Sequence, residues 1–140
     1  MTHKGLKMIK IFLLFTMTIG LALADFSAID NITLEKMQRK GTPIIDIRTP
    51  QEWKETGIIK GSHKIMFFDE RGEPDVANFM FNLGRLMKDK NMPVVLYCAH
   101  ANRSKNVGEW MSKNLGFKHV YELKKGIENG WIKAGKKVIK

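Results

Sequence analysis

The sequence predicts an α/β domain with a central parallel sheet flanked by helices on both faces. Two short runs, residues 43–48 and 94–97, are rich in β-branched residues and lack a strict polar alternation, as is typical of strands buried on both faces. Segments with helical spacing separate these runs along the chain. Strands that alternate with helices form parallel sheets, and such sheets bind ligands beyond the carboxyl ends of their strands.

The first 24 residues have the three-part layout of a secretory signal peptide. Lys4, Lys7 and Lys10 form a basic start, and residues 11–24 contain no charged side chain. The run ends in Ala22-Leu23-Ala24, a small-x-small cleavage pattern. An uncleaved membrane anchor is the weaker alternative, because the apolar run is short for a membrane span.

Cleavage after residue 24 leaves a single expected domain over residues 25–140, and we expect it to be periplasmic without stable membrane insertion. Met8 is an alternative start that keeps a basic region. The formal charge falls from +10 to +7 on cleavage, since the leader holds three lysines and no acid. A solvated basic surface is the ordinary interpretation, and attraction of small anions is the functional one. The lysines are scattered without interleaved aromatics, which argues against a nucleic-acid partner.

The mature chain begins with an expected entry segment, residues 25–33, followed by a short helix over 33–40. Gly41 directly after this segment is a common helix stop, and Asn31 or Thr33 is available as the N-cap.

The strand over 43–48 leads into a second helix with strong start and stop signals. Thr49 is placed as N-cap, Pro50 as the first helical residue, and Glu52 follows three residues after the cap. This pattern is a capping box, and Gly57 closes the helix.

The rest of the chain continues the alternation of short apolar strands and amphipathic helices. The apolar residues after the polar loop over 69–75 recur at helical spacing, so we assign them to the core rather than to a cofactor site. The remaining expected elements are a strand or extended piece over 64–68, a helix over 76–87, the strand over 94–97, a helix from about 104 to 115, a strand over 117–123 and a short helix over 127–132.

Cys98 is the only cysteine and stands directly after the strand over 94–97. Loop amides and the start of the next helix converge where that strand ends, so an anion is stabilised there and a cysteine ionises more easily. A lone cysteine cannot form a disulfide within its own chain, which leaves a buried small hydrophobe or a reactive thiol. Its position at the mouth of the strand favours the reactive thiol.

Asp46 and Arg48 are unusual in a buried strand and fall at the same edge of the expected sheet as Cys98. A structural ion pair is the first interpretation, because buried ionisable groups are normally paired. A supporting role beside the thiol is the alternative.

Four motifs in order make the chain resemble a single-domain rhodanese of the exported type. They are IIDIRTPQEW at 44–53, GIIKGS at 57–62, the VVLYC strand with a loop ending in arginine at 94–103, and HVYELKKGIENGW at 119–131. The resemblance implies a sulfurtransferase in which Cys98 takes a sulfane sulfur from thiosulfate or polysulfide, carries it as a persulfide and passes it to a thiol or cyanide acceptor. It implies no metal and no organic cofactor.

The same resemblance implies an active-site loop whose residues bind the donor. Its members are Ala99, His100, Ala101, Asn102, Arg103 and Ser104. Arg103 could contact anionic donor oxygens or pair with Asp46 to hold the loop, and we favour the pairing.

The loop departs from the Cys-Arg-x-Gly-x-Arg pattern that is common in the family. Ala99 removes a cation, and Ala101 replaces a glycine at a position where positive φ is expected. His100 is either an exposed loop residue or a group for donor binding or proton supply. Outside the loop, Ile58 stands where many relatives have histidine and Lys125 where many have a first glycine.

Three other functions remain as alternatives to a sulfurtransferase. The first is a sulfur carrier that binds polysulfide sulfur without turnover, and the second is a non-catalytic interaction module with a buried Cys98. The third, a phosphatase-like or arsenate-handling enzyme, is disfavoured. That arrangement has five residues between cysteine and arginine, whereas four separate Cys98 from Arg103 here.

Overall fold

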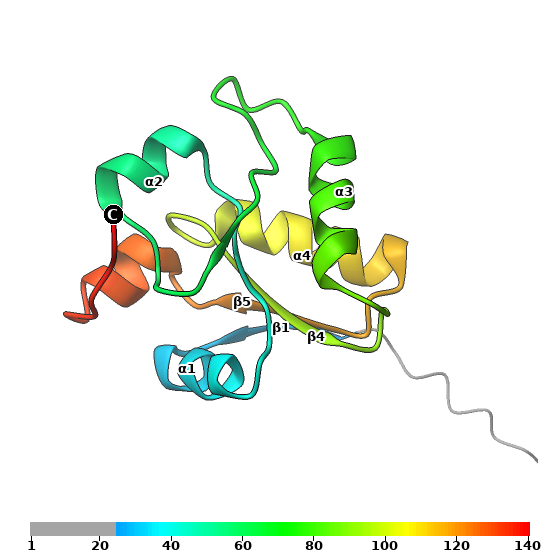
Figure 1. The fold of residues 1–140 in the computed structure, drawn as a ribbon, viewed down its shortest axis with the longest axis horizontal. Helices are drawn as coiled ribbons and strands as arrows, with labels where there is room; N and C mark the ends of the chain where they lie inside the picture. The colour runs from blue at the N-terminus through cyan, green and yellow to red at the C-terminus, as the bar shows by residue number, and fades with distance from the viewer. Residues whose placement is uncertain (1–24) are drawn as a thin grey trace, which may run out of the picture.

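The structure is a computed structural model and describes residues 25–140, so the predicted signal peptide lies outside the described residues. Five parallel strands form one sheet in the order β1-β5-β4-β2-β3 (Figure 1). The strands are β1 (Asp25–Ile29), β2 (Ile44–Asp46), β3 (His63–Lys64), β4 (Pro93–Tyr97) and β5 (His119–Leu123). The helices are α1 (Asn31–Arg39), α2 (Pro50–Thr56), α3 (Val76–Leu86), α4 (Asn102–Leu115) and a π-helix, η1 (Ile127–Ile132).

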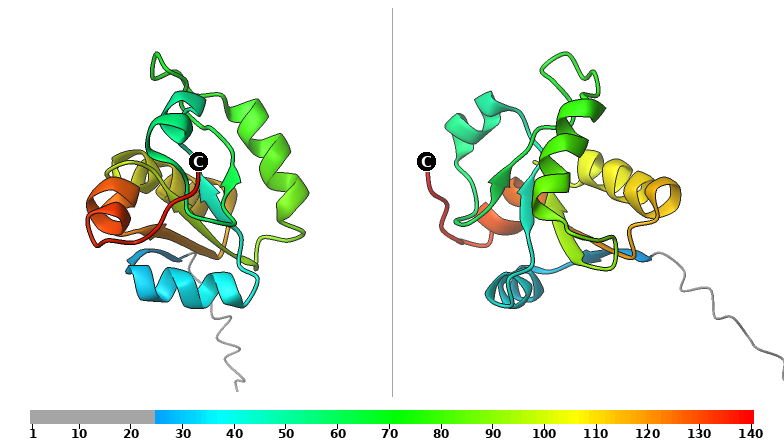
Figure 2. Two further views of the ribbon diagram at one scale, coloured as in Figure 1. Left: turned by 60° about the vertical axis from the view of Figure 1, so that its left-hand side comes forward. Right: turned by 45° about the vertical axis from the view of Figure 1, so that its right-hand side comes forward.

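Helices cover both faces of the sheet, as the two views of Figure 2 show. Val94 and Leu96 of β4 belong to the apolar cluster that α3 and α4 complete. Val95 and Tyr97 alternate with them and belong to the cluster completed by α1 and η1. The period-two geometry of a strand therefore explains why β4 is apolar throughout. The predicted fold class, an α/β domain with a parallel sheet and helices on both faces, is confirmed.

The capping box of α2 is also confirmed. The Thr49 hydroxyl accepts from the backbone N–H of Glu52 at 3.4 Å, and a Glu52 carboxylate oxygen accepts from the backbone N–H of Thr49 at 3.0 Å. Gly57 follows the helix with a φ of +78°. No residue of α2 is fully buried, so the helix is held at the edge of the fold by polar contacts at its two ends.

Two local predictions were wrong. The segment over 25–33, expected only to lead into the fold, contains an edge strand, β1, whose backbone pairs with β5 although its side chains are largely exposed. The N-cap of α1 is Asp30, which accepts from the backbone N–H of Thr33 at 2.8 Å, instead of Asn31 or Thr33 itself. The strand or extended piece predicted over 64–68 is present as β3, which covers only 63–64, followed by an extended segment in which the N–H groups of Ile65 and Phe67 donate to the carbonyl oxygens of Asp46 and Ile47.

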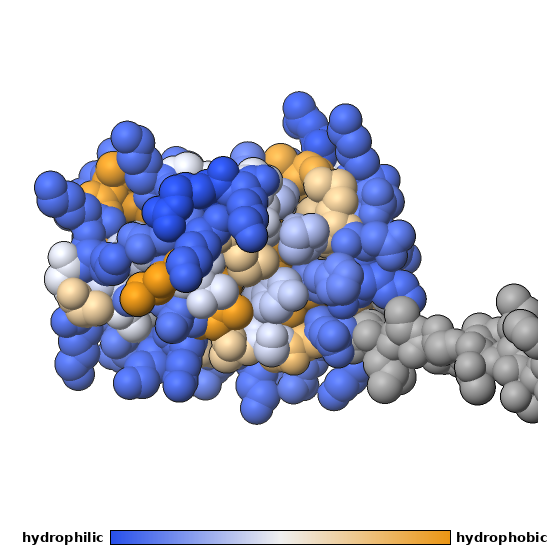
Figure 3. Space-filling view, turned by 90° about the horizontal axis from the view of Figure 1, so that it is seen from below, coloured by the Kyte–Doolittle hydropathy of each residue, from blue (hydrophilic) through white to orange (hydrophobic). Residues whose placement is uncertain are grey.

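The face of the molecule formed by α1 is dominated by hydrophilic side chains with scattered apolar ones (Figure 3). Ile32 is the large apolar side chain that α1 exposes. Within residues 25–140, none of the helices has the length and apolar character needed to span a membrane.

Candidate active site

Cys98 lies directly after β4 and beneath the first turn of α4. Its Sγ accepts a hydrogen bond from the backbone N–H of Ser104 at 3.3 Å and lies 3.4 Å from the Ser104 hydroxyl oxygen. The Ser104 N–H belongs to the start of α4, and the N-terminus of a helix is a place that favours negative charge. The residue is only 1% exposed, so Sγ lies beneath the loop rather than on an open surface.

The loop turns into α4 at Ala101, which has a φ of +72°. Ala101 is the N-cap of α4 and provides no side-chain hydrogen bond to it. The first amides of α4 therefore face the loop without competition from a capping side chain. Positive φ at Ala101 confirms the expectation for this position, and it costs about 1 kcal/mol relative to glycine.

The start of η1 supports the loop from behind. The backbone N–H groups of Ile127 and Glu128 donate to the carbonyl oxygens of Cys98 and Ala99 at 2.9 and 3.1 Å. Gly126 makes this approach possible, because a Cβ on it would lie 2.3 Å from the Ala99 carbonyl oxygen. The loop backbone is thus fixed by a segment almost thirty residues further along the chain.

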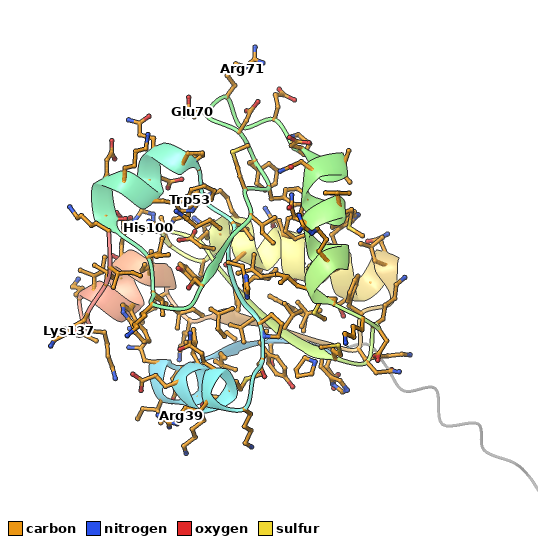
Figure 4. The ribbon with its side chains drawn as sticks, in the orientation of Figure 1. Arg39, Trp53, Glu70, Arg71, His100 and Lys137 are labelled. Carbon is orange, nitrogen blue, oxygen red and sulfur yellow. The ribbon has the colours of Figure 1, made fainter. Side chains whose placement is uncertain are left out.

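His100 lies on the outer part of the loop, between α2 and η1 (Figure 4). Its Nε2 lies 2.7 Å from a Glu128 carboxylate oxygen, and 55% of its side chain is exposed. Asn102, another member of the loop, is exposed as well, whereas Ala99 is buried. Of these residues, His100 presents an ionisable group at the outer surface of the loop.

Arg103 closes the loop by pairing with Glu52 of α2. Its two terminal nitrogens donate to the two carboxylate oxygens at 2.8 and 2.6 Å, a bidentate geometry. Burial alone would raise the pKa of Glu52, but hydrogen bonds from Arg103 and Thr49 hold this pKa at about 2. The predicted pairing of Arg103 with Asp46 was therefore wrong, since Glu52 occupies the guanidinium.

Asp46 and Arg48 form a fully buried ion pair with an Nη2–Oδ2 distance of 2.7 Å. The Arg48 guanidinium also donates to the Thr56 hydroxyl and to the Gly57 carbonyl oxygen. Burial opposes the charged form of Arg48, yet its pKa is raised because the bonds and charge of Asp46 outweigh that effect. The pair joins β2 to the end of α2, which supports the interpretation as a structural ion pair.

Glu122 is a site residue that the sequence analysis missed. It lies on the strand β5, is 6% exposed, and its carboxylate accepts a hydrogen bond from the Ser104 hydroxyl at 2.6 Å. Val120 on the same strand is buried, and residues two apart on a strand share a face. The sequence signal that could have revealed Glu122 is therefore an acidic residue at a position of the strand that faces inward.

A hollow of about 590 Å³ opens beside the loop, between α2, the start of α4 and the turn after Phe68. Glu70 and Arg71 lie at the tip of that turn and project away from the sheet (Figure 4). Residues lining the hollow include Thr49, Glu52, Phe68, Asp69, Asn102 and Arg103. Both members of the Arg103–Glu52 pair line this hollow, whereas Cys98 does not.

In the described part of the chain, His, Cys, Asp and Glu residues form no group of three or more that could hold a metal ion. The arrangement around Cys98 instead provides a buried thiol that faces the Ser104 N–H, and a loop held by the Arg103–Glu52 pair on one side and by η1 on the other. A cysteine at such a place is a candidate nucleophile.

Comparisons of the sequence and of the structure with known proteins agree with one another. The profile described as the rhodanese-like domain matches residues 31–134. A rhodanese-related protein of Thermoplasma volcanium is 25% identical, with a TM-score of 0.61 over 81% of this chain and 97% of that one. The 30 kDa polysulfide-sulfur transferase homodimer of Wolinella succinogenes shares the fold at 23% identity, with a TM-score of 0.61 over 84% of this chain and 81% of that one.

A tRNA uridine(34) hydroxylase of Pelagibacter ubique (strain HTCC1062) is 36% identical over 93 residues, or 64% of this chain. The matched part is 27% of that protein, so the chain spans about a quarter of this relative.

Proposed function

The chain belongs to the rhodanese-like domain family, and from this premise we propose that it transfers sulfane sulfur through a persulfide on Cys98. The observation that carries the proposal is the placement of the Cys98 Sγ at the start of α4, where the Ser104 N–H donates to it. Thiosulfate and polysulfide are the proposed donors, and a thiol or cyanide is the proposed acceptor.

The proposed reaction has two steps. The Cys98 thiolate attacks the outer sulfur of thiosulfate, the sulfur–sulfur bond of the donor breaks, and sulfite leaves with the bonding electrons. The resulting persulfide carries its negative charge on the outer sulfur, one bond beyond Sγ, where the dipole of α4 and the free amides of the loop favour an anion. A thiophilic acceptor then takes the outer sulfur and returns Cys98 to the thiolate.

Arg103 has a structural part in this proposal. Its guanidinium is committed to both oxygens of Glu52, which holds the end of the loop against α2. Donor oxygens are therefore bound mainly by backbone N–H groups of the loop and α4, and the absence of a cation at Ala99 fits this division of roles.

A sulfur carrier without fast turnover is the second candidate, and the burial of Cys98 favours it. A carrier protects its persulfide from solvent, whereas an enzyme must let acceptors reach it. Export to the periplasm is proposed from the pattern of residues 1–24 alone.

Intact-mass analysis after exposure to thiosulfate, and separately to polysulfide, tests the proposal. A sulfurtransferase gains one sulfur atom from either donor, and a later addition of cyanide removes it. A carrier gains sulfur from polysulfide but releases thiocyanate slowly. Cys98→Ala is the control, because the chain has no other cysteine. Sulfur gain by Cys98→Ala, or no gain by the unmodified protein, would contradict a Cys98 persulfide.

A further inference from the structure

Glu122 is a buried carboxylate that has no partner for its charge among its neighbours in the sheet. Its strand neighbours in register are Leu96 of β4 and Ala28 of β1, neither of which can bond a carboxylate. A buried carboxylate is costly unless it is hydrogen-bonded or neutralised. The bond that the side chain makes is to the Ser104 hydroxyl, and it is a short one of 2.6 Å.

Ser104 connects this carboxylate to the active-site thiol. Its hydroxyl oxygen lies 3.4 Å from the Cys98 Sγ on one side and 2.6 Å from the Glu122 Oε2 on the other. Ser104 is fully buried, and a serine hydroxyl has one proton to donate and lone pairs to accept. The Ala101 carbonyl oxygen also lies within reach at 3.2 Å, but the carboxylate is closer, so in the resting orientation the hydroxyl accepts from the thiol and donates to the carboxylate.

We propose that Glu122 is a positioning residue that receives the Cys98 proton through Ser104, so that the thiolate forms without releasing a proton to solvent. The inference rests on the proposed function, because it explains how a buried thiol becomes nucleophilic. The S–H proton moves to the Ser104 oxygen as the Ser104 proton moves to the Glu122 carboxylate. The products are a thiolate, an intact serine hydroxyl and a neutral carboxylic acid, with no change in net charge.

The new arrangement satisfies every member of the chain. Neutral Glu122 donates to the Ser104 oxygen, and the Ser104 hydroxyl now donates to Sγ beside the Ser104 backbone N–H. The thiolate thus gains a second donor in the step that creates it. The buried negative charge is thereby moved from Glu122, which has one donor, to Sγ, which has two donors at the start of α4.

The electrostatic surroundings of Glu122 are consistent with proton uptake. Burial raises its pKa, and this effect exceeds the opposing hydrogen bond from Ser104. The charged groups that face it both come from α4: Lys105 lowers the pKa and Glu109 raises it. Arg103 is bound to Glu52, so it does not neutralise Glu122.

Titration of the thiolate by its ultraviolet absorbance tests the inference without any sulfur donor. Cys98 is the only cysteine, so subtraction of the Cys98→Ala spectrum isolates its signal from the tyrosines. Because the thiol and the carboxylate are coupled, the unmodified protein should ionise in two steps. Between the two steps, a constant fraction of Cys98 should remain as thiolate whatever the pH. This fraction should fall only at the lower pH at which Glu122 takes a proton from solvent.

Glu122→Gln keeps the size and the acceptor oxygen but cannot take a proton. This variant should show a single step, with the thiolate falling about tenfold per pH unit below the thiol pKa. Glu109→Gln is the matched control, because it removes a carboxylate that faces the same region but does not bond Ser104. It should keep the two-step curve.

A single-step curve for the unmodified protein, or two steps retained in Glu122→Gln, would overturn the proton-acceptor role. Loss of the two steps in Glu109→Gln would overturn it too. The two steps would then depend on negative charge near the thiol in general, not on the bond between Glu122 and Ser104. Failure of the proposed function is distinguishable, because it appears as absence of the persulfide in the mass measurement while the titration remains in two steps.

Discussion

The Arg103–Glu52 pair should contribute measurably to stability, and its contribution should disappear in acid. The pKa of Glu52 falls from 4.5 to about 2 on folding. Each pKa unit corresponds to about 1.4 kcal/mol, which sets an upper limit of about 3.5 kcal/mol. The Glu52 side chain is 28% exposed, so solvent screening reduces the expected contribution to about 1–3 kcal/mol.

The substitution Glu52→Gln tests this value by urea denaturation. Because folding lowers the pKa, the stabilisation is fully present above about pH 4.5 and is lost as the pH falls toward about 2. The difference in free energy of unfolding between the unmodified protein and Glu52→Gln should therefore be about 1–3 kcal/mol at pH 7 and should shrink across that window.

Glu55→Gln is the matched control for this prediction. Glu55 lies on the same helix, is exposed, and bonds only to the Gln51 side chain in the described contacts. Its substitution should change the free energy of unfolding by less than about 0.5 kcal/mol at any pH. Equal losses in the two variants, or a loss in Glu52→Gln that does not diminish in acid, would refute the reasoning.

Three further predictions concern the backbone of the loop and the buried ion pair. Ala101→Gly should stabilise the domain by about 0.5–1 kcal/mol in urea denaturation, because φ is +72°, and a loss would show that the alanine makes compensating contacts. Gly126→Ala should cost about 2–4 kcal/mol, because its Cβ would meet the Ala99 carbonyl. Gly41→Ala, also at positive φ but with open space, should cost only about 1 kcal/mol, and equal costs would contradict the close approach. Arg48→Met should cost about 3–5 kcal/mol by leaving Asp46 buried without its partner, and a neutral result would contradict a structural pair.

The parts of the fold that were predictable depend on local signals. The β-branched runs of β2 and β4 and the capping box of α2 are written in consecutive residues, so their patterns were sufficient. The strand β1 was not predictable in the same way. It is an edge strand with exposed side chains, and pairing with β5, not burial, holds it in place.

In the candidate site, too, local sequence signals identified some residues and missed those whose partners are distant in sequence. Cys98 was found because a strand, a cysteine and a helix start are adjacent in sequence. The partners Glu52 and Glu122 were missed because they meet Arg103 and Ser104 across 51 and 18 residues. The capping box already gave Glu52 a local role, and nothing local shows that its carboxylate also binds an arginine.

The active-site loop itself combines both kinds of information. Ala101 and Lys125 both stand where many relatives have glycine, and both have a left-handed backbone, with φ values of +72° and +66°. The sequence could not show that the η1 amides bind the loop carbonyls, because that contact depends on the packing of η1 against the end of β4.

Cyanide-dependent release of thiocyanate from thiosulfate is the most direct test of the central claim that Cys98 transfers sulfur. We predict continuous release by the unmodified protein and none above background by Cys98→Ala. Release that continues in Cys98→Ala would contradict the account, because no other thiol in the chain can carry the sulfur.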